Sequence, residues 1–250
     1  MQVIIDNIEQ FKVFFDVVYD MASELIELKL LPDRMTCAML DRSKTRFFHV
    51  EYESRFFDTY DVDGEESVTI FVEDMHKLLK SCNKKDTLFM EVNDPYLLVK
   101  IVSDNGNSRI FEFVLPSDFV DSPVPPHSEF LAVFDVDVND LKQSVKDIGL
   151  IGSDLIKFVV NGDTLNVTTD NDIATSYVCS VGIDDASVDE NVSSQFGLNY
   201  IGQILKFDKI SKSFTMKMKQ DFPLFFTFKD ELMGVSVNGM IAPILPEEEE

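Results

Sequence analysis

An internal repeat is the feature that most limits what this chain can fold into. The segment ELIELKL at 24–30 is echoed by DLIKFVV at 154–160, at an offset of 130 residues. Later, DPYLLVK at 94–100 is echoed by DFPLFFT at 221–227, at an offset of 127 residues. Chance matches between short apolar strings would not share one order and nearly one offset. The repeat predicts two similar halves of about 120 residues, an ordinary domain size.

Each half has the same order: an amphipathic helix, several strands, a second amphipathic helix and more strands. The helices are predicted because apolar residues recur at helical spacing from Ile8, Met75, Val138 and Leu198 onward. Apolar or alternating runs between them predict strands. The predicted strands are 25–31, 35–40, 45–53, 66–72, 87–92, 97–102 and 108–115 in the first half, and 155–160, 164–169, 174–181, 213–219, 224–228 and 234–237 in the second.

A segment without periodicity separates the halves. Residues 116–127 contain SPVPP and are rich in Pro, Ser and Asp, which is typical of a linker that crosses a surface. The chain closes on PEEEE, and a charge run of this kind predicts a solvated tail. We therefore predict a first domain at 1–116, a connecting loop at 117–130, a second domain at 131–246 and an acidic tail at 247–250.

The charge is lopsided, and the few basic residues are placed unevenly. The chain has 22 Lys and Arg against 45 Asp and Glu, a net charge of −23. This excludes a uniformly basic nucleic-acid binder but leaves room for a basic stripe. A charged outer face is normal for any amphipathic helix, yet here lysines gather at equivalent places of the repeat, which favours a basic surface. The nine lysines are Lys12, Lys77, Lys80, Lys84, Lys142, Lys146, Lys206, Lys209 and Lys212.

No catalytic or metal-binding pattern rises above background. The sequence has no nucleophile elbow, no glycine-rich phosphate loop and no HExxH motif, and its three histidines lie in unrelated contexts. Its three cysteines are far apart and predict reduced thiols. We expect no catalytic residue, no cofactor and no metal. Without a run of about 18 apolar residues or a basic N-terminal leader, we expect no membrane contact and an intracellular location.

Several short motifs, in order along the whole chain, resemble one family. The chain is similar to the sliding clamp (PCNA) family of archaea and eukaryotes, the processivity factors of DNA polymerases. The motifs are AMLD at 38–41 with Ser43, FDTY at 57–60, MHKLLK at 75–80, the connecting loop at 115–126, DIGLIG at 147–152, DFPL at 221–224 and MIAP at 240–243 before the acidic tail. Each string is weak alone, and their order and separation carry the resemblance.

The resemblance implies an α+β fold with two similar domains of antiparallel sheets and paired helices, which assembles into a closed ring. It further implies a homotrimer that encircles double-stranded DNA without sequence preference, with the nine lysines facing the DNA. From the repeat, we expect the strands at 108–115 and 175–181 to pair head to tail, because long unpaired edges are a liability. The expected subunit-interface residues are Phe111, Phe113, Tyr177 and Val178.

The family's client proteins insert a short helical turn into a pocket beneath the connecting loop. The resemblance implies DNA polymerase, clamp loader, flap endonuclease and DNA ligase as partners that bind through short peptide motifs. The location would be the cytoplasm or nucleoid in an archaeon and the nucleus in a eukaryote. The matching pocket positions are Met39, Leu40, Lys44, Phe47, Val124, Pro125, Phe222, Pro223, Ala242, Pro243 and Ile244.

The chain also departs from the family pattern. Its first helix carries Glu9, Asp16 and Asp20 around the single Lys12, and Gln143 stands where the family often has Arg. Both departures weaken the expected contact with DNA. Two other functions remain open at this point: a checkpoint-type clamp subunit, which would favour a heteromeric ring, and an acidic cytosolic hydrolase that uses paired carboxylates, which the repeat and the missing catalytic pattern disfavour.

Overall fold

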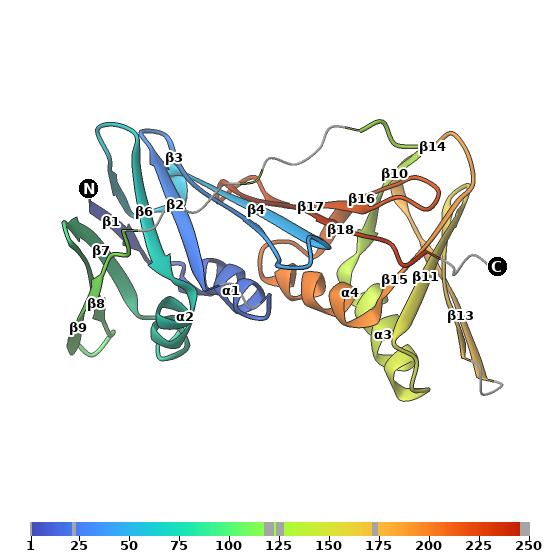
Figure 1. The fold of residues 1–250 in the computed structure, drawn as a ribbon, viewed down its shortest axis with the longest axis horizontal. Coiled ribbons are helices and arrows are strands. Elements are labelled where there is room, and N and C mark those ends of the chain that lie inside the picture. The colour runs from blue at the N-terminus through green and yellow to red at the C-terminus, as the bar shows by residue number, and fades with distance from the viewer. Residues whose placement is uncertain (1, 22–23, 118–122, 124–127, 172–174, 246–250) are drawn as a thin grey trace. The chain divides into compact units, whose positions relative to one another are not determined.

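The described residues of the chain divide into two units (Figure 1). The computed structural model describes residues 2–21, 24–117, 123, 128–171 and 175–245. The first unit takes in Met1–Val124 and Lys229–Val237, and the second takes in Pro125–Phe228 and Asn238–Glu250. In the described residues, each half of the sequence runs in the same order: one strand, a helix, five strands, a helix and three strands. The predicted repeat of helices and strands is therefore present in the structure.

The first half places two sheets next to a pair of helices. One sheet has the order β5-β1-β7-β8-β9, and the strands β4-β3-β2-β6 are consecutive neighbours in another. All pairings within these runs are antiparallel. The elements are β1 (Gln2–Ile5), α1 (Ile8–Tyr19), β2 (Leu25–Leu31), β3 (Arg34–Leu40), β4 (Arg46–Glu53), the 3-10 turn η1 (Ser54–Phe56), β5 (Thr59–Asp61), β6 (Glu66–Phe71), α2 (Val72–Lys80), β7 (Thr87–Asn93), β8 (Tyr96–Val102) and β9 (Ser108–Val114).

The second half repeats this arrangement. One sheet has the order β13-β12-β11-β15, and the strands β14-β10-β16-β17 are consecutive neighbours in another. Their pairings are antiparallel as well. The elements are β10 (Ala132–Asp137), α3 (Val138–Leu150), β11 (Leu155–Asn161), β12 (Thr164–Asn171), β13 (Thr175–Gly182), β14 (Asp184–Val188), β15 (Val192–Gly197), α4 (Leu198–Ile204), the 3-10 turn η2 (Leu205–Lys209), β16 (Ser213–Met218), β17 (Leu224–Asp230) and β18 (Val235–Ile241).

Aromatic side chains fill both cores. In the first unit, Phe11 of α1 is fully buried, and its ring centroid lies 5.2 Å from that of Phe15 and 5.5 Å from that of Tyr52 on β4. In the second unit, Phe214 and Phe228 stack with centroids 4.4 Å apart. Contacts of this kind add to the burial of apolar area, which is the main source of stability. The predicted α+β class with antiparallel sheets is confirmed.

Two predicted helices end earlier than the lysine spacing suggested, which corrects the helical placement of Lys84 and Lys212. Helix α2 stops at Lys80, where the Ser81 hydroxyl donates to the Leu78 carbonyl at 2.7 Å and occupies an acceptor at the end of the helix. Helix α4 stops at Ile204 and tightens into η2, so that Lys206 and Lys209 lie on a 3-10 turn and Lys212 follows it. The Ile210 amide donates to the Phe207 carbonyl at 2.8 Å, and the side chains of both residues are buried.

Five strands were missed by the sequence patterns: β1, β5, β10, β14 and β15. Strand β5 has three residues, and β14 reads DDASV and is almost wholly exposed. Short, polar strands carry little periodic apolar signal, so only pairing with a neighbour reveals them. Among the described residues, no helix is long and apolar enough to span a membrane.

Candidate functional site

Two of the four predicted lysines of the first unit are paired with nearby carboxylates. Lys77 lies one turn after Glu73 on α2 and forms an ion pair with it. Lys84, in the segment after α2, places its Nζ 2.9 Å from Glu9 Oε2 at the start of α1. Lys80 is exposed on α2, and Lys12 is half-buried on α1. The basic residues predicted here are present at the surface, but two of them are already paired with acids.

Helix α1 and helix α2 are joined by a contact that explains one of the unexpected acids. Asp16 Oδ1 on α1 lies 3.1 Å from His76 Nε2 on α2, and the His76 ring stacks on Tyr19 with centroids 4.1 Å apart. His76 is buried in this contact. Asp16 therefore has a structural partner between the helices.

In the second unit, Asp208 forms ion pairs with two of the predicted lysines. Lys142 Nζ of α3 lies 2.7 Å from Asp208 Oδ2, and Lys212 Nζ lies 3.4 Å from the same oxygen. Lys212 also donates to the Asp208 backbone carbonyl at 2.9 Å. Two lysines that are 70 residues apart in sequence thus share one carboxylate. Lys146 on α3 and the η2 residues Lys206 and Lys209 complete the predicted set.

The pKa of Asp208 reflects these contacts. Burial alone would raise the pKa of its carboxyl. The hydrogen bond and charge of Lys142, followed by the charges of Lys212 and Lys209, outweigh burial and hold the pKa below its ordinary value. Asp208 is therefore ionised throughout the neutral range. Sequence reasoning missed it, although Asp208 and Lys212 stand at the i, i+4 spacing of helical ion pairs.

The two strands predicted at the subunit interface both lie at sheet edges. Strand β9 pairs with β8 alone in its sheet order, and β13 pairs with β12 alone. Along β9, Phe111 and Phe113 are half-buried, whereas Ile110 and Val114 on the alternate face are 60% and 63% exposed. On β13, Tyr177 is half-buried and Val178 is 69% exposed. The apolar surface offered by β9 is therefore larger than the predicted residues suggested.

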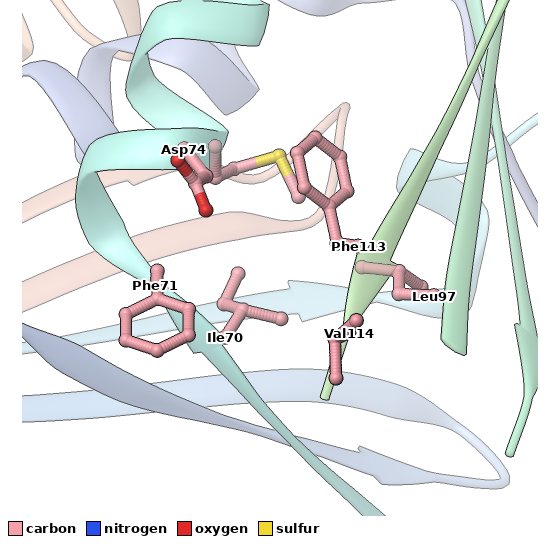
Figure 2. A pocket seen from close by; sticks show the side chains of 7 residues that line it. Ile70, Phe71, Asp74, Leu97, Phe113 and Val114 are labelled. Carbon is pink, nitrogen blue, oxygen red and sulfur yellow. The ribbon is translucent and has the colours of Figure 1, made fainter. Parts of the chain in front are cut away.

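A shallow apolar pocket lies beside the β9 edge of the first unit (Figure 2). Phe113 and Val114 of β9 line it together with Phe71 at the end of β6. Asp74, in the first turn of α2, supplies the acidic group of its wall. Its complete lining is Ile70, Phe71, Asp74, Met75, Leu97, Phe113 and Val114. A pocket of this composition suits an apolar side chain better than a polar ligand.

The predicted client-pocket residues of the first unit lie at the β3–β4 turn. Met39 and Phe47 are buried in the unit, Leu40 is half-buried, and Lys44 is exposed with a φ of 58°. Asp41 organises this turn. Its Oδ1 accepts from the Thr45 amide at 2.7 Å, and its Oδ2 accepts from Arg46 Nε at 2.9 Å.

Asp41 is buried, and its pKa shows the balance of forces in the turn. Burial would raise the pKa of its carboxyl. The hydrogen bonds from the Arg46 amide, the Ser43 hydroxyl, the Arg46 side chain and Thr45 outweigh burial and lower the pKa. The ionised Asp41 carboxylate thus holds the loop that carries Lys44 through several hydrogen bonds.

The remaining client-pocket residues that the structure describes belong to the second unit. Phe222, Pro223, Ala242 and Pro243 are half-buried, and Ile244 is exposed. The Ile244 amide donates to the Gln195 carbonyl at 2.7 Å, which anchors the segment after β18. The predicted residues Val124 and Pro125 lie outside the described residues.

Sequence reasoning missed the neighbours of Phe222. Phe225 stacks on Phe222 with ring centroids 6.3 Å apart, and the Phe130 ring lies 4.9 Å from that of Phe225. Lys219 Nζ lies 5.5 Å from the centre of the Phe222 ring. The three phenylalanines form a half-buried aromatic cluster of the second unit. The FPLFF run at 222–226 was the available signal.

In the parts of the chain that the structure describes, no three His, Cys, Asp or Glu side chains are grouped so that they would hold a metal ion. Cys37 and Tyr52 are buried, and burial raises the pKa of each well above its ordinary value, so neither side chain is ionised at neutral pH.

Fold and sequence comparisons identify the class of protein. The fold is that of a sliding clamp: it matches the crystal structure of PCNA from Thermococcus kodakaraensis with a TM-score of 0.87 at 18% identity, over 97% of this chain and 99% of that one. It matches the PCNA2–PCNA3 complex of Sulfolobus tokodaii with a TM-score of 0.86 at 22% identity, over 97% of this chain and 99% of that one.

The sequence agrees with the fold. Residues 7–121 match the family model of the proliferating cell nuclear antigen N-terminal domain. The DNA polymerase sliding clamp of Methanothermobacter thermautotrophicus is 25% identical, with 94% of each chain covered, and that of Methanobrevibacter smithii is 26% identical, with 95% of each covered. Over nearly its whole length the chain is similar to sliding clamps of the PCNA family, and the predicted resemblance is confirmed.

Proposed function

We propose that this chain is a DNA sliding clamp, a processivity factor that encircles duplex DNA and tethers a DNA polymerase to it. The observation that carries the proposal is the presence of two sheet-edge strands, β9 and β13, that expose apolar side chains on a clamp fold whose helices bear lysines. Both curated relatives described above are named as DNA polymerase sliding clamps. The chain would act without catalysis, as a binding and tethering protein, inside the cell.

Ring closure would use the two edges. Strand β9 offers Ile110 and Val114 beside the apolar pocket, and β13 offers Val178. Pairing β9 of one copy with β13 of the next would satisfy the free backbone groups and cover these side chains. A head-to-tail contact of this kind closes into a ring when the rotation between copies allows it. From the family resemblance, we propose a homotrimer.

Passage of DNA would use the lysines of the two helix pairs. Contacts from lysine to phosphate carry no sequence information and weaken as salt rises. Encirclement then supplies processivity, and the contacts themselves need not be strong. Replacing Lys77, Lys80, Lys142, Lys146 and Lys206 by Ala should lower polymerase stimulation and flatten the salt dependence of DNA binding, while the fold is retained.

Clients would bind through short peptide motifs. We propose that the exposed or half-buried members of the predicted pocket, with the connecting loop at 117–130, receive an aliphatic and an aromatic side chain from the client. The half-buried aromatic cluster around Phe222 supports this proposal, since buried aromatic contacts carry much of the energy in such interfaces. DNA polymerase, clamp loader, flap endonuclease and DNA ligase are the proposed clients.

The experiment that tests the clamp proposal measures assembly and topology together. Light scattering after size-exclusion chromatography should give three chains per particle. A loaded clamp should be retained on closed circular DNA and lost when the circle is cut. Ile110→Lys or Val178→Lys should yield monomers. Leu232→Lys is the matched control, because Leu232 is 91% exposed in the turn between β17 and β18 and lies on neither edge.

A heteromeric ring is the second candidate, and one comparison favours it. The Sulfolobus tokodaii structure that this fold matches is a complex of two different clamp chains. If the pure protein is monomeric at micromolar concentration and low salt, the homotrimer is wrong. Recovery of a ring only after mixing with a second clamp chain would then support a heteromeric clamp.

A further inference from the structure

Four of the nine lysines proposed to face DNA are paired with a carboxylate. Lys77, Lys84, Lys142 and Lys212 each have a carboxylate partner, supplied by Glu73, Glu9 and, for the last two, Asp208. The pattern occurs in both units, on different elements and at different sequence spacings. A surface selected for strong DNA binding would gain from lysines without such partners, because each paired acid lies near the phosphates that the lysine contacts.

The Asp208 cluster, made of Asp208, Lys142 and Lys212, shows this arrangement in its most ordered form. The Asp208 side chain is 14% exposed, whereas the side chains of Lys142 and Lys212 are 40% and 67% exposed. The carboxylate therefore lies beneath the two ammonium groups. An approaching anion would meet the lysines first and would feel the carboxylate at short range behind them.

The backbone around Asp208 is held in place. Its neighbour Phe207 is fully buried, and the Phe207 ring lies 5.7 Å from that of Phe228. Two positions later, Ile210 is also buried. Because η2 is anchored by these side chains, the position of the carboxylate does not depend on the lysines that bind it.

We propose that Asp208 is a positioning residue that limits the strength of phosphate contacts in the second unit. An ammonium group has three donors, so each lysine can keep one bond to Asp208 and still donate to a phosphate. The formal charge of the cluster is +1, where the two lysines alone would give +2. The cluster would attract DNA yet release it readily, which suits a ring that has to move along the duplex. This inference rests on the proposed clamp function.

The consequence of removing the carboxylate differs from that of a structural ion pair. Pairs with exposed partners contribute little to stability, so Asp208→Asn should leave the melting temperature close to that of the wild type. The same change frees two ammonium groups and removes a negative charge next to the phosphate path. We therefore expect Asp208→Asn to tighten binding to duplex DNA about threefold and to steepen the salt dependence by about one unit of log–log slope.

The test uses the full-length protein and a labelled duplex of arbitrary sequence, with affinity measured by fluorescence anisotropy at several salt concentrations. Asp163→Asn is the matched control, because it removes the same charge from an exposed position in the turn between β11 and β12. A second arm repeats both substitutions in the Lys142→Ala, Lys212→Ala background. There, the excess of Asp208→Asn over Asp163→Asn should shrink, since the two ammonium groups that Asp208 binds are gone.

Each outcome decides the proposal. Equal effects of Asp208→Asn and Asp163→Asn would mean that only net charge matters, and would overturn it. Weaker DNA binding by Asp208→Asn would also overturn it, since the carboxylate would then support the contact. Retention on circular DNA tests the clamp function separately. A protein that is retained there, yet is insensitive to Asp208→Asn, is a clamp whose DNA path lies away from this cluster.

Discussion

Helices α1 and α3 are the first helices of the two halves of the repeat, yet they differ in how many of their residues are buried. Eight of the twelve residues of α1 are buried, among them Phe11, Phe14 and Phe15. Only four of the thirteen residues of α3 are buried, and one of these is Ser144. Because α1 has little free surface, it carries one lysine, whereas α3 carries two. The two halves therefore share the order of their elements, but the first helix of each half contributes a different share of its residues to the core.

The carboxylates that pair with lysines also differ in burial between the two units. In the first unit, Glu73 and Glu9 have side chains that are 60% and 45% exposed, so water and salt screen their pairs. In the second unit, Asp208 lies beneath its lysines. The first unit thus has a large core and loose surface pairs, and the second has a smaller helical core and an ordered cluster.

The largest expected effect concerns the helical cores. Phe11→Ala should lower the free energy of unfolding by about 4 kcal/mol, because a fully buried ring with two aromatic neighbours leaves a large cavity. Leu141→Ala, at a buried position of α3, should cost about 3 kcal/mol. Urea unfolding followed by circular dichroism measures both. A larger loss for Leu141→Ala would contradict the proposed division of core burial.

The next effect compares two carboxylates that hold basic groups. Asp41→Asn should cost about 3 kcal/mol, since it leaves the buried Arg46 without its anionic partner. Asp208→Asn should cost less than about 1 kcal/mol, because its lysines can turn to solvent. Thermal or urea unfolding of both variants tests the contrast. Similar losses would show that the Asp208 cluster is a structural pair and not a surface one.

The pH dependence of stability should follow the same ranking. The pKa values of Asp41 and Asp208 are both lowered in the folded protein. A lowered pKa contributes stability that is present above the pKa of the unfolded state, about 3.9 for Asp, and that is lost as the pH falls through the folded-state value. Unfolding measured between pH 7 and pH 2 should therefore show a drop below about pH 4, smaller in Asp41→Asn than in Asp208→Asn. An unchanged drop in Asp41→Asn would contradict this assignment.

How much the sequence could predict depended on whether a signal was local. Strand β2 was predicted at its observed bounds because LIELKLL alternates between the core and the surface. Strands β14 and β15 were missed because DDASV and VSSQFG lack that alternation and form only by pairing with β10 and β11. Strand β10 does alternate, but its six residues lie between the loop predicted to end at residue 130 and the helix predicted from Val138.

For the lysines of the candidate site, too, only contacts between residues close in sequence could be predicted. The lysines could be found from spacing, and so could the Glu73–Lys77 pair, which stands at i, i+4. The partnership of Lys142 with Asp208 could not, because it joins α3 to η2 across 66 residues. The helical placement of Lys84 and Lys212 was wrong because spacing alone does not show that α2 ends at Lys80 or that α4 ends at Ile204 and is followed by η2.

The smallest expected effect compares the acids of the two units in DNA binding. Glu73→Gln removes the partner of Lys77, but that pair is exposed on both sides and is already broken for part of the time in solution. DNA affinity should therefore rise by less than about twofold, and by less than in Asp208→Asn, although each substitution removes one negative charge. Anisotropy titrations of both variants at one low salt concentration make the comparison, with Glu231→Gln as control because Glu231 forms an exposed pair with Lys229, which is not one of the nine proposed lysines. If Glu73→Gln tightens binding as much as Asp208→Asn, the depth of the carboxylate is irrelevant, and the difference between the two units does not extend to their contact with DNA.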